Sequence, residues 1–424
     1  MIGQLKRLFV RNKIAKETAW AILAKGVTFV LIYTLDVFLP RYLGPELYGE
    51  WAFFFSILTI LVFASHLGIN TATRKFVAQH LGTPDLRAVL RASFKLRITA
   101  SLLFAAVLWF SYEPLARVMD RAALATLLQA AVPLIFLMGL IEYIRNIFMG
   151  LHRIRYNFML NCFDYGLRLA LAIAFLLFSK ELVAVVHAFT TAGIITVAAG
   201  LWMLYTAFYH KLPPSNRPFT REIFLYSLPM LVLGIGFIIL TELDNVMIGL
   251  ILKDDGQVAL YAVAQRIVVK LPQFNLAIAM GTLPLFARMT HENRHELRRL
   301  LYRLLKLNTL LFGGVCLGIL ATSWFLIPLI YGEEYRASVL PLNVLTLYLL
   351  IFSYSIYLSG VLDYQGLAMR RAINLSVAIV VKVVLNLILI PRWGIVGAAF
   401  ATSVCCIPYL ILNWLEVRKS LGTA

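Results

Sequence analysis

The apolar positions of the chain form long, unbroken runs. Each run is about 20 residues or longer, which is the length that an α-helix needs to cross a bilayer. Strands that cross a bilayer alternate apolar and polar residues instead. The pattern therefore predicts an all-α integral membrane protein with about 12 transmembrane helices. Their expected positions are residues 17–39, 48–70, 93–112, 121–150, 156–178, 182–209, 222–252, 257–287, 303–330, 337–363, 371–391 and 394–416.

Composition supports the same class. The 424 residues are 61% hydrophobic and 14% charged, with a mean hydropathy of +0.82. Soluble domains have about 45–50% apolar and about 25% charged residues. A water-soluble fold could not bury this much apolar surface, and the short loops leave no room for a separate extramembrane domain.

The net charge of +18 is explained by topology. With the N-terminus inside, the segments predicted to be cytoplasmic hold 27 of the 39 Lys and Arg residues, and the outside loops hold 7. This is the positive-inside bias of membrane proteins. It predicts cytoplasmic N- and C-termini and a basic surface that contacts anionic membrane lipids. A nucleic-acid partner is not needed to account for the charge.

The two halves of the chain resemble each other. Residues 48–57, "YGEWAFFFSI", are echoed by residues 258–267, "VALYAVAQRI", at an offset of 210. Six spans in each half give both halves the same orientation, and such parallel repeats with a cleft between them are typical of transporters. We therefore expect an N-terminal six-helix lobe at 1–210, a cytoplasmic linker at 211–221 and a C-terminal six-helix lobe at 222–424. The two bundles are expected to form a V-shaped cleft. A duplicated bundle without transport remains the alternative.

Cations within predicted spans are the first candidates for substrate binding. A charge at the centre of the bilayer is costly, so it usually faces a cavity or a partner. Arg266 and Lys270 are four residues apart and share one helix face. Such cations would suit an anionic cargo carrying phosphate or carboxylate groups, moved by alternating access. The five in-span cations are Lys25, Arg168, Arg266, Lys270 and Lys382.

Acidic residues within spans have two interpretations. Asp164 and Arg168 are spaced i,i+4, and Glu142 and Arg145 are spaced i,i+3, which favours structural salt bridges. The other cations have no acid one turn away, and the sequence leaves open whether they line a cavity or pair across helices. Coupling to an H⁺ or Na⁺ gradient, if it exists, would use acids such as Asp244, Glu242, Asp363 and Asp36. No cofactor is expected.

Residues 291–295 read "HENRH" and fit the H-E-x-x-H pattern of zinc hydrolases. A zinc site needs a third ligand, and the Arg-rich flanks disfavour a dication. Leu297, Leu300, Leu301 and Leu304 instead follow a helical apolar spacing. We therefore expect an amphipathic helix at the inner interface and regard the motif as coincidental, so the protein is expected to be a transporter and not an enzyme.

Several stretches carry a resemblance to a known family. They are "RYLGPELYGEWAFFFSIL", "HLGINTATRKFVAQ", "LDNVMIGLIL" with "VALYAVAQRIV", "LIYGEEYRASVLPLNVL" and "NLILIPRWGIVGAAFATSV". In this order they resemble the O-antigen-type polysaccharide flippases of the multidrug/oligosaccharidyl-lipid/polysaccharide exporter superfamily. The resemblance implies that Asp244 and Arg266 occupy family-typical positions, and that Lys25 lies where the first helix lines the cavity.

The resemblance also implies a function. It would be translocation of a polyprenyl-diphosphate-linked oligosaccharide from the inner to the outer leaflet of the cytoplasmic membrane, for cell-surface polysaccharide biosynthesis. Partners would be the anionic lipid-linked glycan and a polymerase or glycosyltransferases of the same pathway. The alternatives are a lipid II flippase, a cation-coupled drug antiporter, a membrane enzyme of glycan assembly, and a scaffold that does not transport.

Overall fold

A computed structural model describes the backbone of residues 2–272, 275, 282–288 and 294–422. Side chains are described at these positions except 2–25, 232, 233, 284, 287, 288 and 294. In this part of the chain all regular structure is helical and no strand occurs. The predicted all-α fold class is confirmed.

Nine helices of the described chain are long and apolar enough to cross a bilayer. Two of them each contain two predicted spans. Helix α1 (Ile2–Ser65) breaks at Gly44, where φ is 75° and Pro45 follows. Helix α12 (Ala368–Ser420) breaks at Gly394, where φ is 57°. Positive φ values favour glycine because it has no Cβ, so these two residues mark the short connections that the sequence predicts.

The chain divides into two compact units, which are described separately. Unit 1 comprises Met1–Phe38 and Leu61–Leu231, and unit 2 comprises Leu39–Ile60 and Val232–Ala424. Helix α1 therefore contributes residues to both units. The predicted lobe limits, at residues 210 and 222, remain a prediction.

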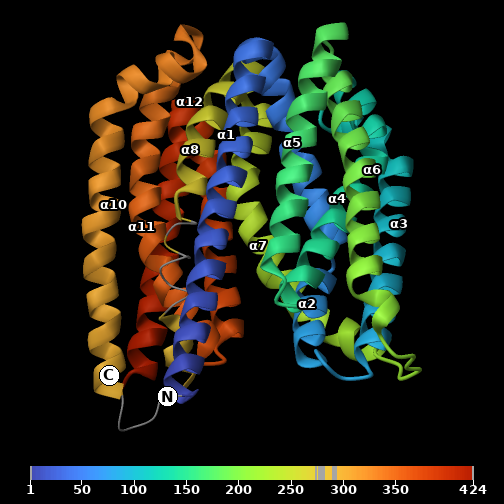
Figure 1. The fold of residues 1–424 in the computed structure, drawn as a ribbon. Helices are drawn as coiled ribbons and strands as arrows, with labels where there is room; N and C mark the ends of the chain where they lie inside the picture. Colours follow the sequence, from blue (N-terminus) through green and yellow to red (C-terminus); the bar gives the residue numbers. More distant parts are fainter. Residues whose placement is uncertain (1, 273–274, 276–281, 289–293, 423–424) are drawn as a thin grey trace. The chain divides into compact units, whose positions relative to one another are not determined.

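Unit 1 is built around α4. Helix α4 packs against α2, α3 and α6, and α5 packs against α6 (Figure 1). The buried core between them includes Tyr143, Ile147 and Phe148 of α4. The helices are the two ends of α1, α2 (Ile69–Gln79), α3 (Leu86–Val118), α4 (Ala122–Gly150), α5 (Ile154–Phe178), α6 (Leu182–Ala207) and the first turns of α7 (Thr220–Leu252), with the short helix η1 (Tyr209–Lys211).

Unit 2 repeats this packing order. Its helices are the middle of α1, the rest of α7, α8 (Asp255–Lys270), η2 (Leu283–Arg288), α10 (Arg294–Tyr331), η3 (Glu333–Ser338), α11 (Val339–Tyr364) and α12. Helix α11 packs against α10, α8 and α12. Ser403, in the part of α12 that follows the break, donates to the carbonyl of Val344 of α11 at 3.1 Å. This part of α12 thus contacts α11, just as α6 packs on α4 in unit 1. The common order agrees with the predicted internal repeat.

Three predicted boundaries need correction. The eighth span, expected at 257–287, does not continue as one helix, because α8 ends at Lys270 and Leu283 begins the short helix η2. The span expected at 48–70 ends at Ser65, because Leu67 and Gly68 have positive φ values of 44° and 71° and separate α1 from α2. The separate interfacial helix expected before the ninth span is the start of α10. Its Leu297 and Leu301 are buried in a core with residues of α11 and α12, so they pack on protein and not on lipid.

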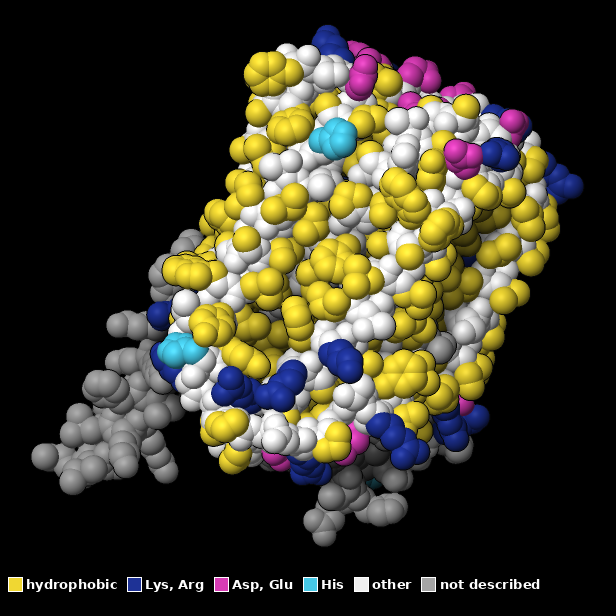
Figure 2. All heavy atoms as spheres, turned by 90° about the vertical axis from the view of Figure 1, so that its right-hand side faces the viewer, with side chains coloured by type: hydrophobic (Ala, Val, Ile, Leu, Met, Phe, Trp, Pro, Cys, Tyr) yellow, Lys and Arg dark blue, Asp and Glu magenta, His cyan; other side chains and the backbone are white. Residues whose placement is uncertain are grey.

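The surface of the molecule is that of a membrane protein. Figure 2 shows a face on which apolar side chains form a broad band, with Lys and Arg gathered along its lower edge. Large exposed apolar side chains of unit 1 include Phe110 on α3 and Trp202 on α6, which are 81% and 68% exposed. Such side chains are stable in contact with lipid and unfavourable in water. The protein is a multi-pass membrane protein.

Candidate functional site

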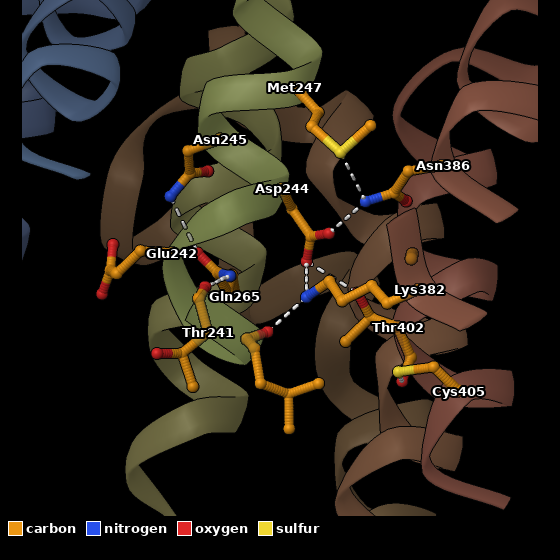
Figure 3. Close-up of polar contacts among 12 residues, drawn as sticks. Thr241, Glu242, Asp244, Asn245, Met247, Gln265, Lys382, Asn386, Thr402 and Cys405 are labelled. Carbon is orange, nitrogen blue, oxygen red and sulfur yellow. Dashed lines mark hydrogen bonds and ion pairs between the residues drawn. The ribbon is translucent and has the colours of Figure 1, made fainter. Parts of the chain in front are cut away.

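A buried carboxylate, Asp244 of α7, is the centre of a polar cluster in unit 2 (Figure 3). It accepts four hydrogen bonds from side chains of α8 and α12. The donors are Tyr261 Oη at 2.6 Å, Lys382 Nζ at 2.8 Å, Asn386 Nδ2 at 2.8 Å and Thr402 Oγ1 at 2.6 Å. Because Lys382 and Thr402 lie on opposite sides of the break at Gly394, one carboxylate joins α7, α8 and both parts of α12.

The ion pair in this cluster is completely buried. The side chains of Asp244 and Lys382 are both 0% exposed, and Lys382 also donates to the carbonyl of Leu240. A buried ion is tolerated only when its charge is paired and its remaining hydrogen-bonding groups are satisfied. Lys382 was predicted as a cavity cation, and the structure places it in a pair across helices, the alternative that the sequence left open.

A second polar group lies beside the first on α7. Asn245 donates to Ser56 Oγ at 3.0 Å and to Gln265 Oε1 at 2.9 Å. Ser56 in turn donates to Glu242 Oε2 at 2.8 Å, and Gln265 donates to the carbonyl of Thr241. In Figure 3 the side chains of Glu242 and Asp244 point in different directions from α7. The helix therefore presents its two acids to two different polar groups, and Glu242 is the more exposed of the two.

One of the two cations of α8, Arg266, directly follows Gln265 of the second group. The Arg266 guanidinium lies over the rings of Tyr48 and Phe55, at 6.0 and 5.9 Å from their centroids. These distances allow cation–π attraction. Arg266 and Lys270 are both partly buried, and Lys270 is the last residue of α8. The side chain of Lys25, the remaining predicted cavity cation of this group, lies outside the described residues.

Unit 1 contains its own charged network between α4 and α5. Asp164 accepts from Arg168 Nε and from Arg145 Nη2, both at 2.8 Å. Arg145 also reaches Glu142 at 3.5 Å. The predicted salt bridges of Asp164 with Arg168 and of Glu142 with Arg145 are confirmed. The Arg168 guanidinium also lies 5.3 Å from the centroid of the Phe189 ring, so a carboxylate and an aromatic ring hold this predicted substrate-binding residue.

A buried arginine on α3 was missed by the sequence-based reasoning. Arg97 is 0% exposed and donates to the carbonyl of Ser65 at 2.8 Å and to Ser65 Oγ at 3.1 Å. Ser65 is the last residue of α1, where unpaired carbonyls give a partial negative charge. The guanidinium thus caps α1 at its break. The sequence pattern placed Arg97 in a cytoplasmic loop because α3 begins earlier than its apolar run.

The other predicted site residues are dispersed. Asp36 is buried in the part of α1 that belongs to unit 1. Asp363, near the end of α11, forms an ion pair with Arg371. His291 and Glu292 of the H-E-x-x-H motif lie outside the described residues, and His295 is exposed in the first turn of α10. Among the described residues, no group of three or more His, Cys, Asp and Glu side chains could hold a metal ion.

The remaining partners of Asp244 also escaped prediction. Tyr261, Asn386 and Thr402 are neutral residues in apolar runs, and such residues are common in transmembrane helices. One signal was available: Asn386 follows Lys382 by four residues, which places an amide and an ammonium on the same face of one helix. The sequence did not reveal which helix supplies their common acceptor.

Comparison with solved structures shows which proteins share this fold. The chain shares its fold with an inward-facing multidrug resistance MATE family transporter of the MOP superfamily. The TM-score is 0.78 and the identity 16%, covering 95% of this chain and 98% of that one. It shares the fold also with the lipid II flippase MurJ, with a TM-score of 0.74 and 17% identity over 94% and 87% of the two chains. The fold is therefore that of a MOP-superfamily transporter.

The chain belongs to the polysaccharide biosynthesis protein family, whose model matches residues 14–290. A probable low-salt glycan biosynthesis flippase, Agl15 of Haloferax volcanii, is 26% identical over 224 residues, 52% of this chain. The match spans only 46% of the Haloferax protein, about half its length. An uncharacterized membrane protein of Methanocaldococcus jannaschii is 22% identical over 93% of this chain and 95% of its own length.

Proposed function

We propose that the protein is a flippase that moves a polyprenyl-diphosphate-linked oligosaccharide from the inner to the outer leaflet of the cytoplasmic membrane by alternating access. The observation that carries this proposal is membership of the polysaccharide biosynthesis protein family on a transporter fold. The description of the Haloferax relative as a glycan flippase supports it. The Lys and Arg distribution supports cytoplasmic termini.

The residues that we propose to contact the diphosphate are the cations of α8. Arg266 offers two parallel N–H donors to phosphate oxygens, and Lys270, one turn away, offers a point charge. Lys382 and Arg168 each donate to a buried carboxylate, and we assign them a structural role. The family resemblance implies that Lys25, on the first helix, also lines the cavity.

We propose that any ion coupling uses Glu242 and not Asp244. The Asp244 carboxylate accepts four hydrogen bonds and is fully buried. Glu242 is partly exposed and accepts from Ser56. A carboxylate that can reach water is able to exchange a proton or bind a cation during transport. The expected result is that Glu242→Gln abolishes any dependence of flipping on an imposed H⁺ or Na⁺ gradient.

The proposed function is tested in liposomes that contain the purified protein and a fluorescent polyprenyl-diphosphate oligosaccharide. Quenching by a membrane-impermeant reagent reports which leaflet holds the glycan. We expect Arg266→Gln combined with Lys270→Gln to stop the exchange between leaflets. The matched control, Arg418→Gln with Lys419→Gln, removes two exposed cations from the end of α12 and should leave flipping intact.

The same variants separate the alternatives in cells. A flippase that loses Arg266 and Lys270 should deplete the surface glycan and accumulate the lipid-linked intermediate inside. A scaffold would keep the surface glycan intact in this variant. A drug antiporter or lipid II flippase would leave the oligosaccharide lipid unmoved in liposomes and transport its own substrate instead.

A further inference from the structure

The outward face of α10 is a surface that the proposed function does not use. Helix α10 packs against α11 in unit 2 (Figure 1). Its buried face includes Leu297, Leu301 and Leu304. The opposite face follows the spacing of successive helical turns and consists of exposed side chains and glycines. These are Arg299, Arg303, Lys306, Leu310, Gly314 and Gly318.

The first part of this face is cationic. Arg299, Arg303 and Lys306 are exposed and lie on three successive turns. None of them forms an ion pair with a carboxylate in the described part of the chain. Beside them Tyr302 packs edge-on against Trp414, with ring centroids 5.9 Å apart. Tyr and Trp concentrate at the level of lipid headgroups, so the three cations lie at that level.

The second part of the face is apolar and includes glycines. Leu310 is 74% exposed. A Cβ atom added at Gly313, Gly314 or Gly318 would meet no protein atom within 4 Å. Glycine lowers the stability of a helix interior relative to alanine, and no packing against this protein compensates here. Side chains are therefore missing at these three glycines, between the exposed Leu310 and other exposed apolar residues of α10.

The apolar part of the face has the length of a bilayer. At about 1.5 Å per residue, Lys306 and Trp324 are separated by about 27 Å, close to the roughly 30 Å of the hydrocarbon core. Trp324 is 65% exposed and marks the opposite interface. One helix face thus presents cations at one membrane surface and apolar residues across the interior.

We propose that this face binds a phosphate-bearing anionic phospholipid, with its headgroup on Arg299, Arg303 and Lys306 and an acyl chain along Leu310, Gly314 and Gly318. Guanidinium and ammonium groups form charge-assisted hydrogen bonds with phosphate oxygens. The apolar part of the face favours a lipid over free phosphate, which would use only the cationic end. This proposal does not depend on the proposed function.

A second copy of the chain is the competing occupant, since Gly314 and Gly318 form a G-x-x-x-G pattern that lets transmembrane helices approach. Charge argues against it. In a two-fold symmetric dimer the same patch meets itself, so the three cations of each copy would face those of the other. Like charges in contact are unfavourable, whereas an anionic headgroup complements them.

Native mass spectrometry of the purified full chain tests the proposal. The protein is released from micelles that contain phosphatidylglycerol and phosphatidylcholine with identical acyl chains, and the retained lipids are counted. We expect preferential retention of phosphatidylglycerol. The variant Arg299→Gln/Arg303→Gln/Lys306→Gln should reduce this preference by roughly a hundredfold at low salt, about fivefold for each cation. Filling the apolar part of the face with Gly314→Leu/Gly318→Leu should reduce retention of both lipids.

The matched control is Arg74→Gln/Arg91→Gln/Lys95→Gln, which removes three exposed cations from α2 and α3 of unit 1. It should keep the preference. The proposal is overturned if the α10 variant keeps it, or if both triple variants lose it equally. It is also overturned if the native chain is a dimer that the leucine variant converts to a monomer with unchanged lipid retention. If the triple variant does not fold, Arg303→Gln alone provides the test, and we expect it to reduce the preference for phosphatidylglycerol about fivefold.

Discussion

Replacing Lys382 by methionine should destabilise unit 2 severely. Methionine keeps most of the side-chain length and removes the ammonium. Asp244 would then be a buried, unpaired carboxylate, since both side chains are 0% exposed. Removing one partner of such a pair costs about 3–5 kcal/mol. For a unit of this size, that loss corresponds to a fall in the melting temperature of roughly 10 °C.

The assay heats the purified protein in detergent and measures, at each temperature, the fraction that stays monodisperse. Asp244→Asn combined with Lys382→Met removes both charges and should melt above Lys382→Met alone, because no uncompensated ion remains. The interaction between the two changes should be about 0.5–3 kcal/mol, the range for residues in contact.

An exposed ion pair provides the control. Glu333 and Arg336 are 71% and 65% exposed and form a salt bridge of 2.7 Å. Pairs of this kind contribute about 0–1 kcal/mol, so Arg336→Gln should hardly change the melt. The reasoning is refuted if Lys382→Met has the same melting temperature as the native protein. It is also refuted if the melting temperature of the double variant lies below those of both single variants.

Three further predictions concern packing and charge. Gly139→Ala should lower the melting temperature, because the added Cβ would overlap the Arg97 guanidinium. Gly166→Ala should be neutral or stabilising, because its Cβ meets nothing within 4 Å. Equal melting temperatures of the two variants would contradict this. Asp164→Asn should cost about 3–5 kcal/mol, because two guanidiniums lose their shared carboxylate, and an unchanged melt would argue against it. Arg266→Lys should slow flipping in liposomes although the charge is kept, because lysine lacks the planar group that lies over two aromatic rings; a native rate would exclude that role.

The sequence was sufficient for the fold class because each span is a long local signal. Apolar runs, with Pro and Gly at their ends, locate helices without any knowledge of the neighbours. The break at Gly44 was visible in the same way. The ends of α1 and α3 were not, since Ser65, Leu67 and Arg97 follow an ordinary apolar and basic pattern. The end of α1 coincides with a tertiary contact, its capping by Arg97 of another helix, which no local pattern reveals.

The candidate site was predictable only where partners share a helix. The Asp164 and Arg168 pair follows from a spacing of four residues. The Asp244 and Lys382 pair joins residues 138 apart in the chain, and no local pattern relates them. The sequence therefore identified both residues as significant charges in the membrane but could not show that they belong to one cluster.

The pairing of two in-span cations with carboxylates changes the net charge that is expected at the predicted cavity. Five in-span cations suggested a strongly positive cavity. In the structure, Lys382 and Arg168 are each held by a buried carboxylate, so their charges are compensated within one unit and serve mainly to join helices. In the function that we propose, recognition of the anionic cargo would be centred on Arg266 and Lys270 of α8. With fewer contributing cations, the loss of each should have a larger effect on transport, whereas changes at Lys382 should act first on stability.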